Sequence, residues 1–476
     1  MTDLALFRRV APLLLLFFAP LALPCSAAAD PTSYTLALDV NYGSGEFEGT
    51  MTVVHANCTP NALWELFFRL YPNSSTLYSE ASIEVLDAHV GAKPVETSLF
   101  VDDTVLMLPL PQPLEPGQTV SVALSFRGRA SQRLTVPSPV THEYGILTKT
   151  PNVLTLTSFY PLLTPYLDEG WALDPIVGIG DALFAEASSY DVSLRVDARP
   201  TPIATGVLTD ATRESDRVVY RYAADHARDF SIVLVDDGRV PRRVEVAGIG
   251  IRVWFRPDRG PAATRALERA GAAVTLFSDL IGPLPYDEID VVEVPLQHIG
   301  GVELTGLVLL SETYTADPYD PFFDILVSHE VAHEWFYAAV GNDPVESPWL
   351  DEGVVTYLSN VFLAEAVSRD VAAAERQRWE RSVSLSQSVH PELTLTAPLY
   401  RFPDSTTYSA FAYSGAAAEF AALRDRLGDG AFFAALAAYY QDSLFTIASP
   451  SDLREAFENA CGCTMDGALF ADPGSP

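Results

Sequence analysis

Hydrophobic and polar residues alternate along much of the chain between residues 30 and 240. Alternation with a period of two places successive side chains on opposite faces of a β-strand. Turn-forming pairs such as Pro72-Asn73 and Pro116-Gly117 separate the alternating segments. We expect strands at residues 34–40, 49–55, 63–70, 105–110, 120–126, 190–196 and 218–222. The pattern predicts a β-sandwich-like N-terminal domain over residues 30–240.

The periodicity changes after residue 240 and becomes mostly helical. Apolar residues at helical spacing predict a helix over residues 262–280, and an apolar run at 289–295 predicts a buried strand. Three pairs have the N-cap and first-turn residues of a helix start: Asp320-Pro321, Ser347-Pro348 and Ser449-Pro450. Gly341 and the residues up to 344 predict the end of the helix that starts at Asp320. We expect a mostly helical domain with a small sheet over residues 241–470 and a tail at 471–476.

The first 29 residues have the features of a signal peptide. Arg8 and Arg9 precede an apolar run at residues 10–23, and small residues at 27–29 offer a cleavage site. A retained signal anchor and a lipoprotein anchored at Cys25 are the alternatives, although Pro24 suits the second poorly. No later stretch is long and apolar enough to span a membrane. We expect a secreted or extracytoplasmic protein.

The amino-acid composition indicates the class of protein and limits the kinds of molecule that it can bind. The chain of 476 residues is 48% hydrophobic and 19% charged, which is typical of a globular protein of two domains. Its net charge of −32 argues against a nucleic-acid partner, because binding phosphates requires clustered Lys and Arg.

Once the leader is removed, three cysteines are left, which is an odd number: Cys58, Cys461 and Cys463. A Cys461–Cys463 bridge would be strained, and two thiols are too few for a zinc site, so we expect structural cysteines.

The segment His329-Glu330-Val331-Ala332-His333 is the candidate site of the chemistry. Histidines at i and i+4 project from one face of a helix about one turn apart, the spacing that two ligands of one zinc ion need. Glu330 projects beside them, where it can take a proton from water. A catalytic zinc needs a third protein ligand, and Glu352 downstream is the natural choice. The alternative is a helix with a packed histidine and a surface glutamate.

This constellation resembles the aminopeptidase N family of zinc metallopeptidases, whose signature is H-E-x-x-H, eighteen residues, then E. Residues 334–351 are those eighteen, and Trp349-Leu350-Asp351-Glu352-Gly353 is similar to the family's W-L-N-E-G. The resemblance implies a thermolysin-like catalytic domain that binds one Zn²⁺ per chain through His329, His333 and Glu352. The chain resembles a short form without the large C-terminal helical domain of longer members, so we expect a more open cleft.

Two further segments carry weaker parts of the resemblance. Residues 300–304 are similar to the family's G-x-M-E-N, which implies that Glu303, with Gly301 beside it, binds the free amine of a substrate. Leu304 and Val302 depart from that pattern. The family's Y-x-K-G-A tyrosine, which donates to an oxyanion, has no exact counterpart. Tyr413 is one position off, and a local bulge at the helix start could restore it; Tyr408 is the other candidate.

We therefore expect a secreted zinc metallopeptidase, most simply an aminopeptidase acting on peptides with Glu330 as general base. A zinc endopeptidase or other hydrolase using the same site is one alternative. An inactive peptide-binding member of the family is another, because no Gln that binds the substrate's amine is found near residues 157–159. The sequence does not indicate an oligomeric state.

Overall fold

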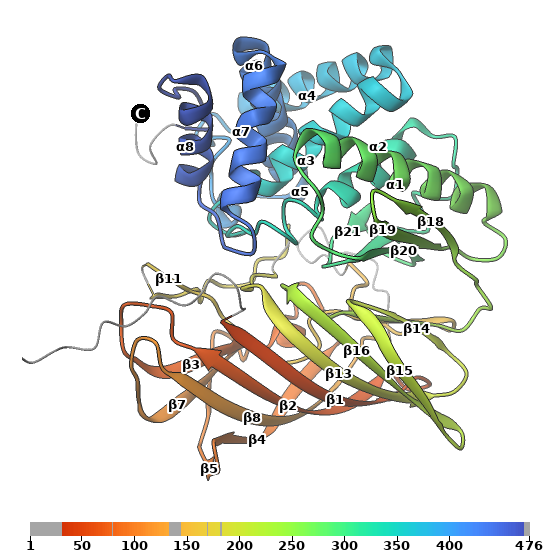
Figure 1. The fold of residues 1–476 in the computed structure, drawn as a ribbon, viewed down its shortest axis with the longest axis vertical. Coiled ribbons are helices and arrows are strands. Elements are labelled where there is room, and N and C mark those ends of the chain that lie inside the picture. The colour runs from red at the N-terminus through yellow and green to blue at the C-terminus, as the bar shows by residue number, and fades with distance from the viewer. Residues whose placement is uncertain (1–30, 79, 133–143, 169, 181–182, 471–476) are drawn as a thin grey trace, which may run out of the picture.

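The computed structural model describes residues 31–78, 80–132, 144–168, 170–180 and 183–470. The expected leader at residues 1–29 and the expected tail at 471–476 lie outside the described residues. Within the described part, a β-rich region comes first and a region of helices over a small sheet follows (Figure 1). This is the expected fold class, and no described helix is long and apolar enough to cross a membrane.

The largest described sheet has eight strands in the order β15-β16-β13-β1-β2-β8-β4-β5. The bounds of its strands are β1 (Thr32–Asn41), β2 (Glu46–Ala56), β4 (Ser82–Val90), β5 (Lys93–Pro94), β8 (Thr119–Arg129), β13 (Ser188–Asp197), β15 (Val207–Glu214) and β16 (Arg217–Ala227). Strand β1 pairs antiparallel with β2 and parallel with β13. Five of the seven predicted strands lie in this sheet, and β4, β5 and β15 were not predicted.

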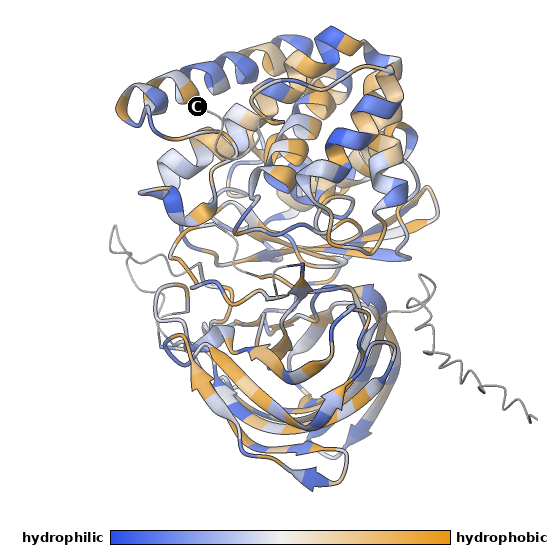
Figure 2. Ribbon diagram, turned by 90° about the vertical axis from the view of Figure 1, so that its left-hand side faces the viewer, coloured by the Kyte–Doolittle hydropathy of each residue, from blue (hydrophilic) through white to orange (hydrophobic). Residues whose placement is uncertain are grey.

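Three smaller sheets complete the β-rich region, in the orders β10-β3-β7-β6, β14-β17-β9 and β11-β12. The bounds of their strands are β3 (Leu63–Arg69), β6 (Ser98–Phe100), β7 (Val105–Leu114), β9 (Val153–Leu156), β10 (Leu162–Leu163), β11 (Tyr166–Leu167), β12 (Gly170–Trp171), β14 (Thr201–Ala204) and β17 (Ile232–Val235). A one-turn 3₁₀ helix, η1 (Tyr71–Asn73), follows β3. In β1 and β2 of the largest sheet, alternate residues are buried, and Figure 2 shows hydrophobic and hydrophilic residues alternating along strands of the β-rich region.

The second region has a five-stranded sheet in the order β18-β19-β20-β22-β21. Its strands are β18 (Arg242–Val246), β19 (Ile249–Trp254), β20 (Glu288–Val294), β21 (Gly301–Val302) and β22 (Leu307–Ser311). Strands β19, β20 and β22 run parallel, whereas β21 pairs antiparallel with β22 at the edge of the sheet. The α-helices are α1 (Gly260–Leu280), α2 (Pro321–Ala332), α3 (Trp349–Phe362), α4 (Arg369–Val389), α5 (Ser405–Tyr408), α6 (Ala416–Leu427), α7 (Asp429–Asp442) and α8 (Pro450–Cys461).

The helix that carries the histidines begins where the sequence predicts and ends earlier. The Asp320 carboxylate accepts from the backbone N–H of Phe322, as an N-cap should. The helix ends at Ala332, not near Gly341 as expected. Beyond it the chain continues in turns whose backbone bonds reach back three, four or five residues, as from Ala338 N to His333 O (2.9 Å). The expected cap at Ser347 is also wrong, because Pro348 is the N-cap of α3 and no side chain caps that helix.

The β-rich region and the second region share an apolar contact. Val233 and Val235 of β17 belong to one buried cluster with Val292 of β20 and Leu309 of β22. Burial of such side chains favours association of the two regions by roughly 25 cal/mol for each Å² of apolar surface removed from water. Strand β21, beside β22, therefore lies close to the junction of the two regions (Figure 1).

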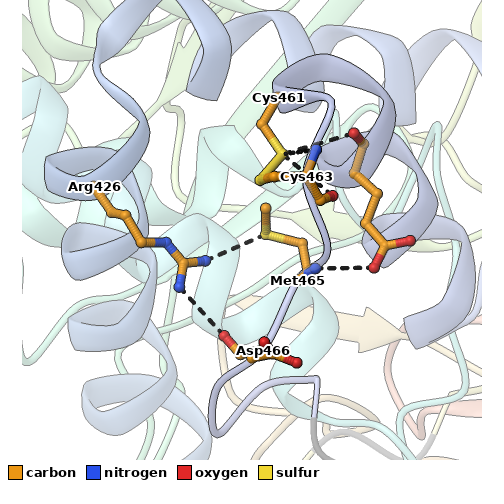
Figure 3. The surroundings of a disulfide bond; sticks show 6 residues. Arg426, Cys461, Cys463, Met465 and Asp466 are labelled. Carbon is orange, nitrogen blue, oxygen red and sulfur yellow. Dashed lines mark hydrogen bonds between the residues drawn. A yellow bond between two sulfur atoms is a disulfide. The ribbon is translucent and has the colours of Figure 1, made fainter.

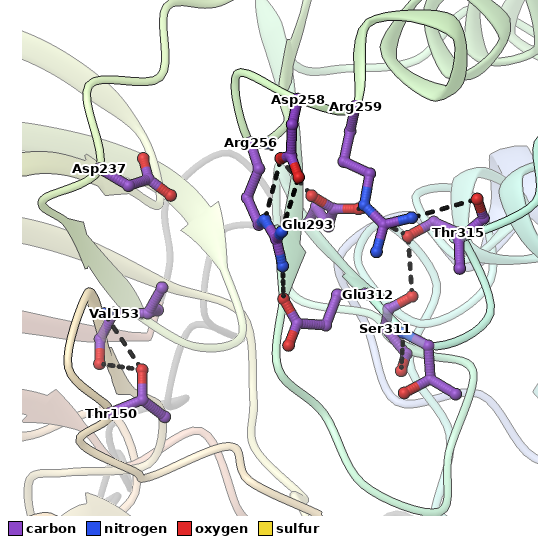
Figure 4. Close-up of polar contacts among 12 residues, drawn as sticks. Thr150, Val153, Asp237, Arg256, Asp258, Arg259, Glu293, Ser311, Glu312 and Thr315 are labelled. Carbon is purple, nitrogen blue, oxygen red and sulfur yellow. Dashed lines mark hydrogen bonds and ion pairs between the residues drawn. The ribbon is translucent and has the colours of Figure 1, made fainter.

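A charged cluster closes the carboxyl ends of the parallel strands (Figure 4). The Glu293 carboxylate at the end of β20 accepts from Thr315 Oγ1 (2.9 Å) and from the backbone N–H of Arg256 (3.1 Å). The Arg256 guanidinium donates to Asp258 (2.8 Å) and to Glu312 (3.3 Å). These bonds tie the end of β20 to the loop that follows β22 and leads into α2.

The cysteines correct one expectation from the sequence. Cys461 and Cys463 form a disulfide, with their Cα atoms 5.2 Å apart (Figure 3). Gly462 between them has φ 64° and ends α8 in the left-handed conformation that glycine adopts without steric cost. That turn lets two residues so close in sequence meet. The described residues include no free cysteine.

Candidate metal centre and active site

Three side chains from two consecutive helices converge at the centre of the second region. His329 lies in the last turn of α2, His333 is the residue directly after that helix, and Glu352 lies in the first turn of α3. The Nε2 atoms of the two imidazoles are 3.3 Å apart. Glu352 Oε2 is 3.3 Å from His329 Nε2 and 3.5 Å from His333 Nε2. His333 keeps helical dihedral angles (φ −62°, ψ −18°), so the early end of α2 does not disturb the spacing of the histidines.

The spacing of these three atoms fits one zinc ion. Ligand atoms placed tetrahedrally at about 2.0–2.1 Å from a common ion are about 3.3 Å from one another. The observed separations of 3.3, 3.3 and 3.5 Å are of that size. Two imidazole nitrogens and one carboxylate oxygen are also a donor set that suits Zn²⁺. A zinc ion held by three protein atoms keeps one position open for water or substrate.

Neighbouring groups orient the three ligand atoms. The Nδ1 atom of His333 lies 3.0 Å from the carbonyl oxygen of Phe336, which fixes the ring and leaves Nε2 for a metal. The Tyr413 hydroxyl donates to Glu352 Oε1. Glu352 Oε2 is buried and lies within 3.5 Å of the Nε2 atoms of both imidazoles, so it faces the place where a metal would lie.

The electrostatics of the cluster favour a cation. Burial lowers the pKa of His333, but the carboxylates of Glu303, Glu352 and Glu330 outweigh burial and raise that pKa well above its usual value. Burial likewise opposes ionisation of Glu352, and the two imidazoles outweigh it and lower the pKa of this carboxyl group. Acidic groups gathered around a pair of imidazoles stabilise positive charge between them, which a divalent ion supplies.

Glu330 lies beside the three ligand atoms and points toward β21. Its side chain is 5% exposed, and its Oε2 atom has no hydrogen-bond partner. Burial raises the pKa of Glu330 to about 8 in the metal-free protein. A nearby divalent cation would favour the ionised form and so lower this pKa. The carboxylate also packs on Gly301, where a Cβ atom would collide with it, so glycine at that position makes room for Glu330.

Glu303 follows the edge strand β21 and comes close to the cluster without joining the three ligands. Ligand atoms of Glu303, Glu330 and His333 all lie within 4.8 Å of one another. Strand β21 contacts α2, and its second edge is not paired within the described residues. The structure therefore brings Gly301 and Glu303 close to Glu330.

Tyr413 reaches the centre because its helix contains an extra residue. Residues Ser409–Gly415 form the π-helical segment η4, in which each turn holds about one residue more than an α-helix. The Tyr413 ring stacks on His329, with ring centroids 5.8 Å apart and an angle of 10° between the rings. Tyr408 packs edge-on against Tyr413 at 5.4 Å and is only 4% exposed. Of the two tyrosines considered, Tyr413 has the hydroxyl that bonds to Glu352.

Comparison with known proteins agrees with this geometry. Residues 265–469 match the peptidase family M1 domain, and this range includes all the side chains described above. The match therefore covers most of the second region of the chain. Aminopeptidase M1-C of rice is 23% identical to the chain over 453 residues, covering 91% of this chain and 48% of the rice protein. Human aminopeptidase RNPEPL1 is 32% identical over 170 residues, covering 34% of this chain and 23% of the human protein.

Solved structures of similar fold cover both regions of the chain. An M1 zinc metallopeptidase from Deinococcus radiodurans has a TM-score of 0.65 at 19% identity and covers 91% of each chain. A two-domain M1 zinc metallopeptidase bound to L-arginine gives a TM-score of 0.66 at 18% identity. The chain spans 48%, 26% and 26% of the length of the first three curated relatives. The matching family and the similar structures are those of zinc metallopeptidases, and the three atoms described above fit a zinc ion.

Several buried residues near the candidate site belong to no motif that can be recognised in the sequence. Arg228 and Asp229 precede β17, whereas Glu334 and Tyr337 follow His333 directly. All four are buried, from 1% to 5% exposed. A charged residue inside an otherwise apolar run, as in residues 228–235, is the one signal that could have drawn attention to the first pair.

Proposed function

We propose that the chain is a zinc-dependent aminopeptidase that hydrolyses the first peptide bond of a peptide. The observation that carries this proposal is the position of Glu303. Its carboxylate lies within 4.8 Å of ligand atoms of Glu330 and His333, yet the metal site is complete without it. A carboxylate at that place gives a substrate's protonated α-amine a charged partner at a fixed distance from the reacting centre.

The edge strand β21 suits the backbone of such a substrate. An extended peptide can add to an unpaired strand edge through main-chain hydrogen bonds. Gly301 and Val302 form that strand, and Glu303 follows them directly. A peptide that pairs with β21 and places its amine on Glu303 presents its first carbonyl group to the metal centre.

Glu330 is the proposed general base. Zinc bound by His329, His333 and Glu352 would polarise the scissile carbonyl group and make water more acidic. The Glu330 carboxylate, which has a free oxygen in the site, takes the proton of the attacking water and returns it to the departing amine. General acid–base catalysis of this kind contributes about 10²–10⁴-fold to the rate.

Tyr413 is the proposed donor to the developing oxyanion. Burial and the nearby Glu352 carboxylate raise the pKa of Tyr413 well above its usual value, so its hydroxyl stays protonated and able to donate. In the substrate-free protein that hydroxyl bonds to Glu352. We propose that it turns to the carbonyl oxygen of the substrate, where negative charge develops.

Substrates that differ only in whether their α-amine is free or acetylated test the proposal. Wild type should release one N-terminal residue from aminoacyl chromogenic substrates, lose this activity with a chelator and recover it with Zn²⁺. N-acetylated versions of the same compounds should not be cleaved. Glu303→Gln should raise KM for the free-amine substrates about tenfold or more, because a charge-assisted bond contributes more than a neutral one.

The same assay separates the alternatives. Cleavage of N-blocked, internally quenched peptides at a rate equal to that of free-amine substrates would make the protein an endopeptidase. Binding of peptides without cleavage, with zinc present, would make it a peptide-binding protein.

We also propose that the protein acts outside the cytoplasm. The leader-like pattern of residues 1–29 supports export. The Cys461–Cys463 disulfide is a second support, because disulfides persist in oxidising compartments. N-terminal sequencing of the protein from its native location would test cleavage of the leader.

A further inference from the structure

Two adjacent charged residues connect the β-rich region to the proposed substrate site. Arg228 and Asp229 lie between β16 and β17, and their side chains are 2% and 1% exposed. Both precede the range that matches the M1 domain, residues 265–469. Burying a charged group is costly unless hydrogen bonds compensate, so their partners indicate what the pair does.

Arg228 binds the chain that follows the metal-binding helix. Its guanidinium donates to the carbonyl oxygens of Tyr337 (2.5 Å) and Ala339 (3.3 Å). It also donates to the carbonyl oxygens of Thr446 (2.7 Å) and Ala185 (3.2 Å). The planar guanidinium has five N–H donors in a fixed arrangement, so it holds these segments in one relative position. This is where the chain leaves regular α-helical bonding after α2.

Asp229 binds two segments of the M1 domain at once. Its Oδ2 atom accepts from the backbone N–H of Thr305 (3.0 Å), from Thr305 Oγ1 (3.2 Å) and from the Tyr337 hydroxyl (3.0 Å). Its Oδ1 atom accepts from Ser231 Oγ (2.9 Å). Through one carboxylate group, a residue of the β-rich region thus joins Thr305 to Tyr337.

These two segments are the ones that carry the reacting groups. Thr305 comes two residues after Glu303, and Tyr337 comes four residues after His333. The segments are also bonded to each other, because Glu334 Oε2 accepts from the backbone N–H of Gly306 (3.0 Å). The turn after Glu303 and the turn after His333 therefore form one hydrogen-bonded unit on Asp229.

We propose that Arg228 and Asp229 are positioning residues that set the distance between the amine-binding Glu303 and the metal-binding His333. This inference rests on the proposed aminopeptidase function. It means that the β-rich region, which contributes none of the groups assigned to the chemistry, determines where the substrate's amine lies relative to the metal. A misplacement of about 1 Å in such an arrangement can reduce the rate about 10²-fold.

Asp229→Asn tests the proposal because it preserves shape and replaces one acceptor oxygen by a donor. The matched control is Asp290→Asn, which changes another buried carboxylate, 2% exposed, whose side chain bonds to Arg252 and Trp254 on β19. Tyr337→Phe is the milder variant, since it removes one bond to Asp229 and should fold even if Asp229→Asn does not. For each purified full-length protein, kcat and KM on a free-amine aminoacyl substrate, zinc per chain and the thermal midpoint are measured.

We expect Asp229→Asn to raise KM about tenfold, Tyr337→Phe to raise it about threefold, and both to keep one zinc per chain with kcat changed less than threefold. Asp290→Asn should lower the thermal midpoint without changing KM. The proposal is overturned if Tyr337→Phe and Asp229→Asn behave like this control, or if they lose zinc or kcat while KM stays constant. A wild-type protein that releases no N-terminal residue would instead refute the proposed function itself.

Discussion

The proposed metal-binding half and the proposed substrate-binding half of the site are built differently. The metal half rests on two regular helices, in which α2 places His329 and His333 and α3 places Glu352. The substrate half rests on irregular backbone: Glu303 follows a two-residue edge strand, and Tyr413 lies in a π-helical segment. Regular helices fix the spacing of side chains by themselves, whereas irregular segments depend on contacts made elsewhere in the fold.

This difference has a functional consequence. Zinc tolerates little variation in the distances to its ligands, and a helix of fixed pitch meets that demand locally. The amine and the oxyanion of a substrate must be reached from other directions, which the same two helices do not offer. The irregular half is therefore held by distant residues such as Asp229, and its variants should affect KM or kcat without loss of zinc.

Among the variants that test this difference between the two halves, Glu330→Gln should show the largest loss of activity. The variant should keep one zinc per chain, because Glu330 is not a ligand, and lose kcat by about 10³-fold, because the general base is removed. Exposed Glu268 on α1 offers a matched control, Glu268→Gln. Zinc analysis and steady-state kinetics are the measurements. Activity of Glu330→Gln within tenfold of the control would contradict the assignment.

Tyr413→Phe, a variant in the irregular half of the site, should show a smaller loss of kcat. Removing one donor to an oxyanion typically costs about 10²–10³-fold in kcat, with zinc retained. Tyr408→Phe should cost less than tenfold, because Tyr408 packs edge-on against Tyr413, whose hydroxyl bonds to Glu352. Single-turnover kinetics would separate chemistry from binding. The reverse order of the two losses would show that the wrong tyrosine has been assigned to the oxyanion.

Gly301→Ala should reduce activity by about tenfold, because an added Cβ atom collides with the Glu330 carboxylate and displaces it. Gly250→Ala on β19 is a matched control, since its Cβ atom would meet its neighbours only at 3.6 Å and beyond. The pair is compared by kcat and by thermal midpoint. Equal kcat values for the two variants would mean that the position of Glu330 does not depend on Gly301.

The smallest predicted effect concerns stability, and it contrasts the metal-binding histidines with a buried histidine that has no such role. Burial lowers the pKa of His55 to about 4, below its usual value of 6.5. Between pH 6.5 and pH 4 the unfolded chain binds more protons than the folded chain. The free energy of unfolding therefore has its full value above pH 6.5 and falls toward pH 4, by up to about 3 kcal/mol. The urea-unfolding free energy of His55→Asn should therefore fall less than that of wild type between pH 7 and 4.5. Parallel curves would contradict this prediction.

The difference between regular and irregular segments also explains which features could be predicted from the sequence. The strands of the eight-stranded sheet that alternate strictly, such as β1 and β2, could be predicted from their pattern, and so could the convergence of His329, His333 and Glu352. The helix α4 was missed, because it buries only Ala372 and Trp379 and so lacks a continuous apolar face.

Other features depend on contacts between distant residues. The chain beyond the end of α2 at Ala332 bonds to Arg228, and no local signal in the sequence marks these bonds. The position of Tyr413 depends on one extra residue in a helical turn, which a fixed period cannot place. The roles of Arg228 and Asp229 appear only once Thr305 and Tyr337 are seen beside them.

The most direct test of the central claim is the zinc content of the wild-type chain and of Glu352→Gln, measured by mass spectrometry of metals on protein purified without added metal. Wild type should contain one zinc per chain. Glu352→Gln removes the ionised oxygen that lies 3.3 and 3.5 Å from the two imidazoles and should contain far less zinc and show no peptidase activity. A wild-type chain without zinc affinity, or a variant that retains zinc and full activity, would contradict the account.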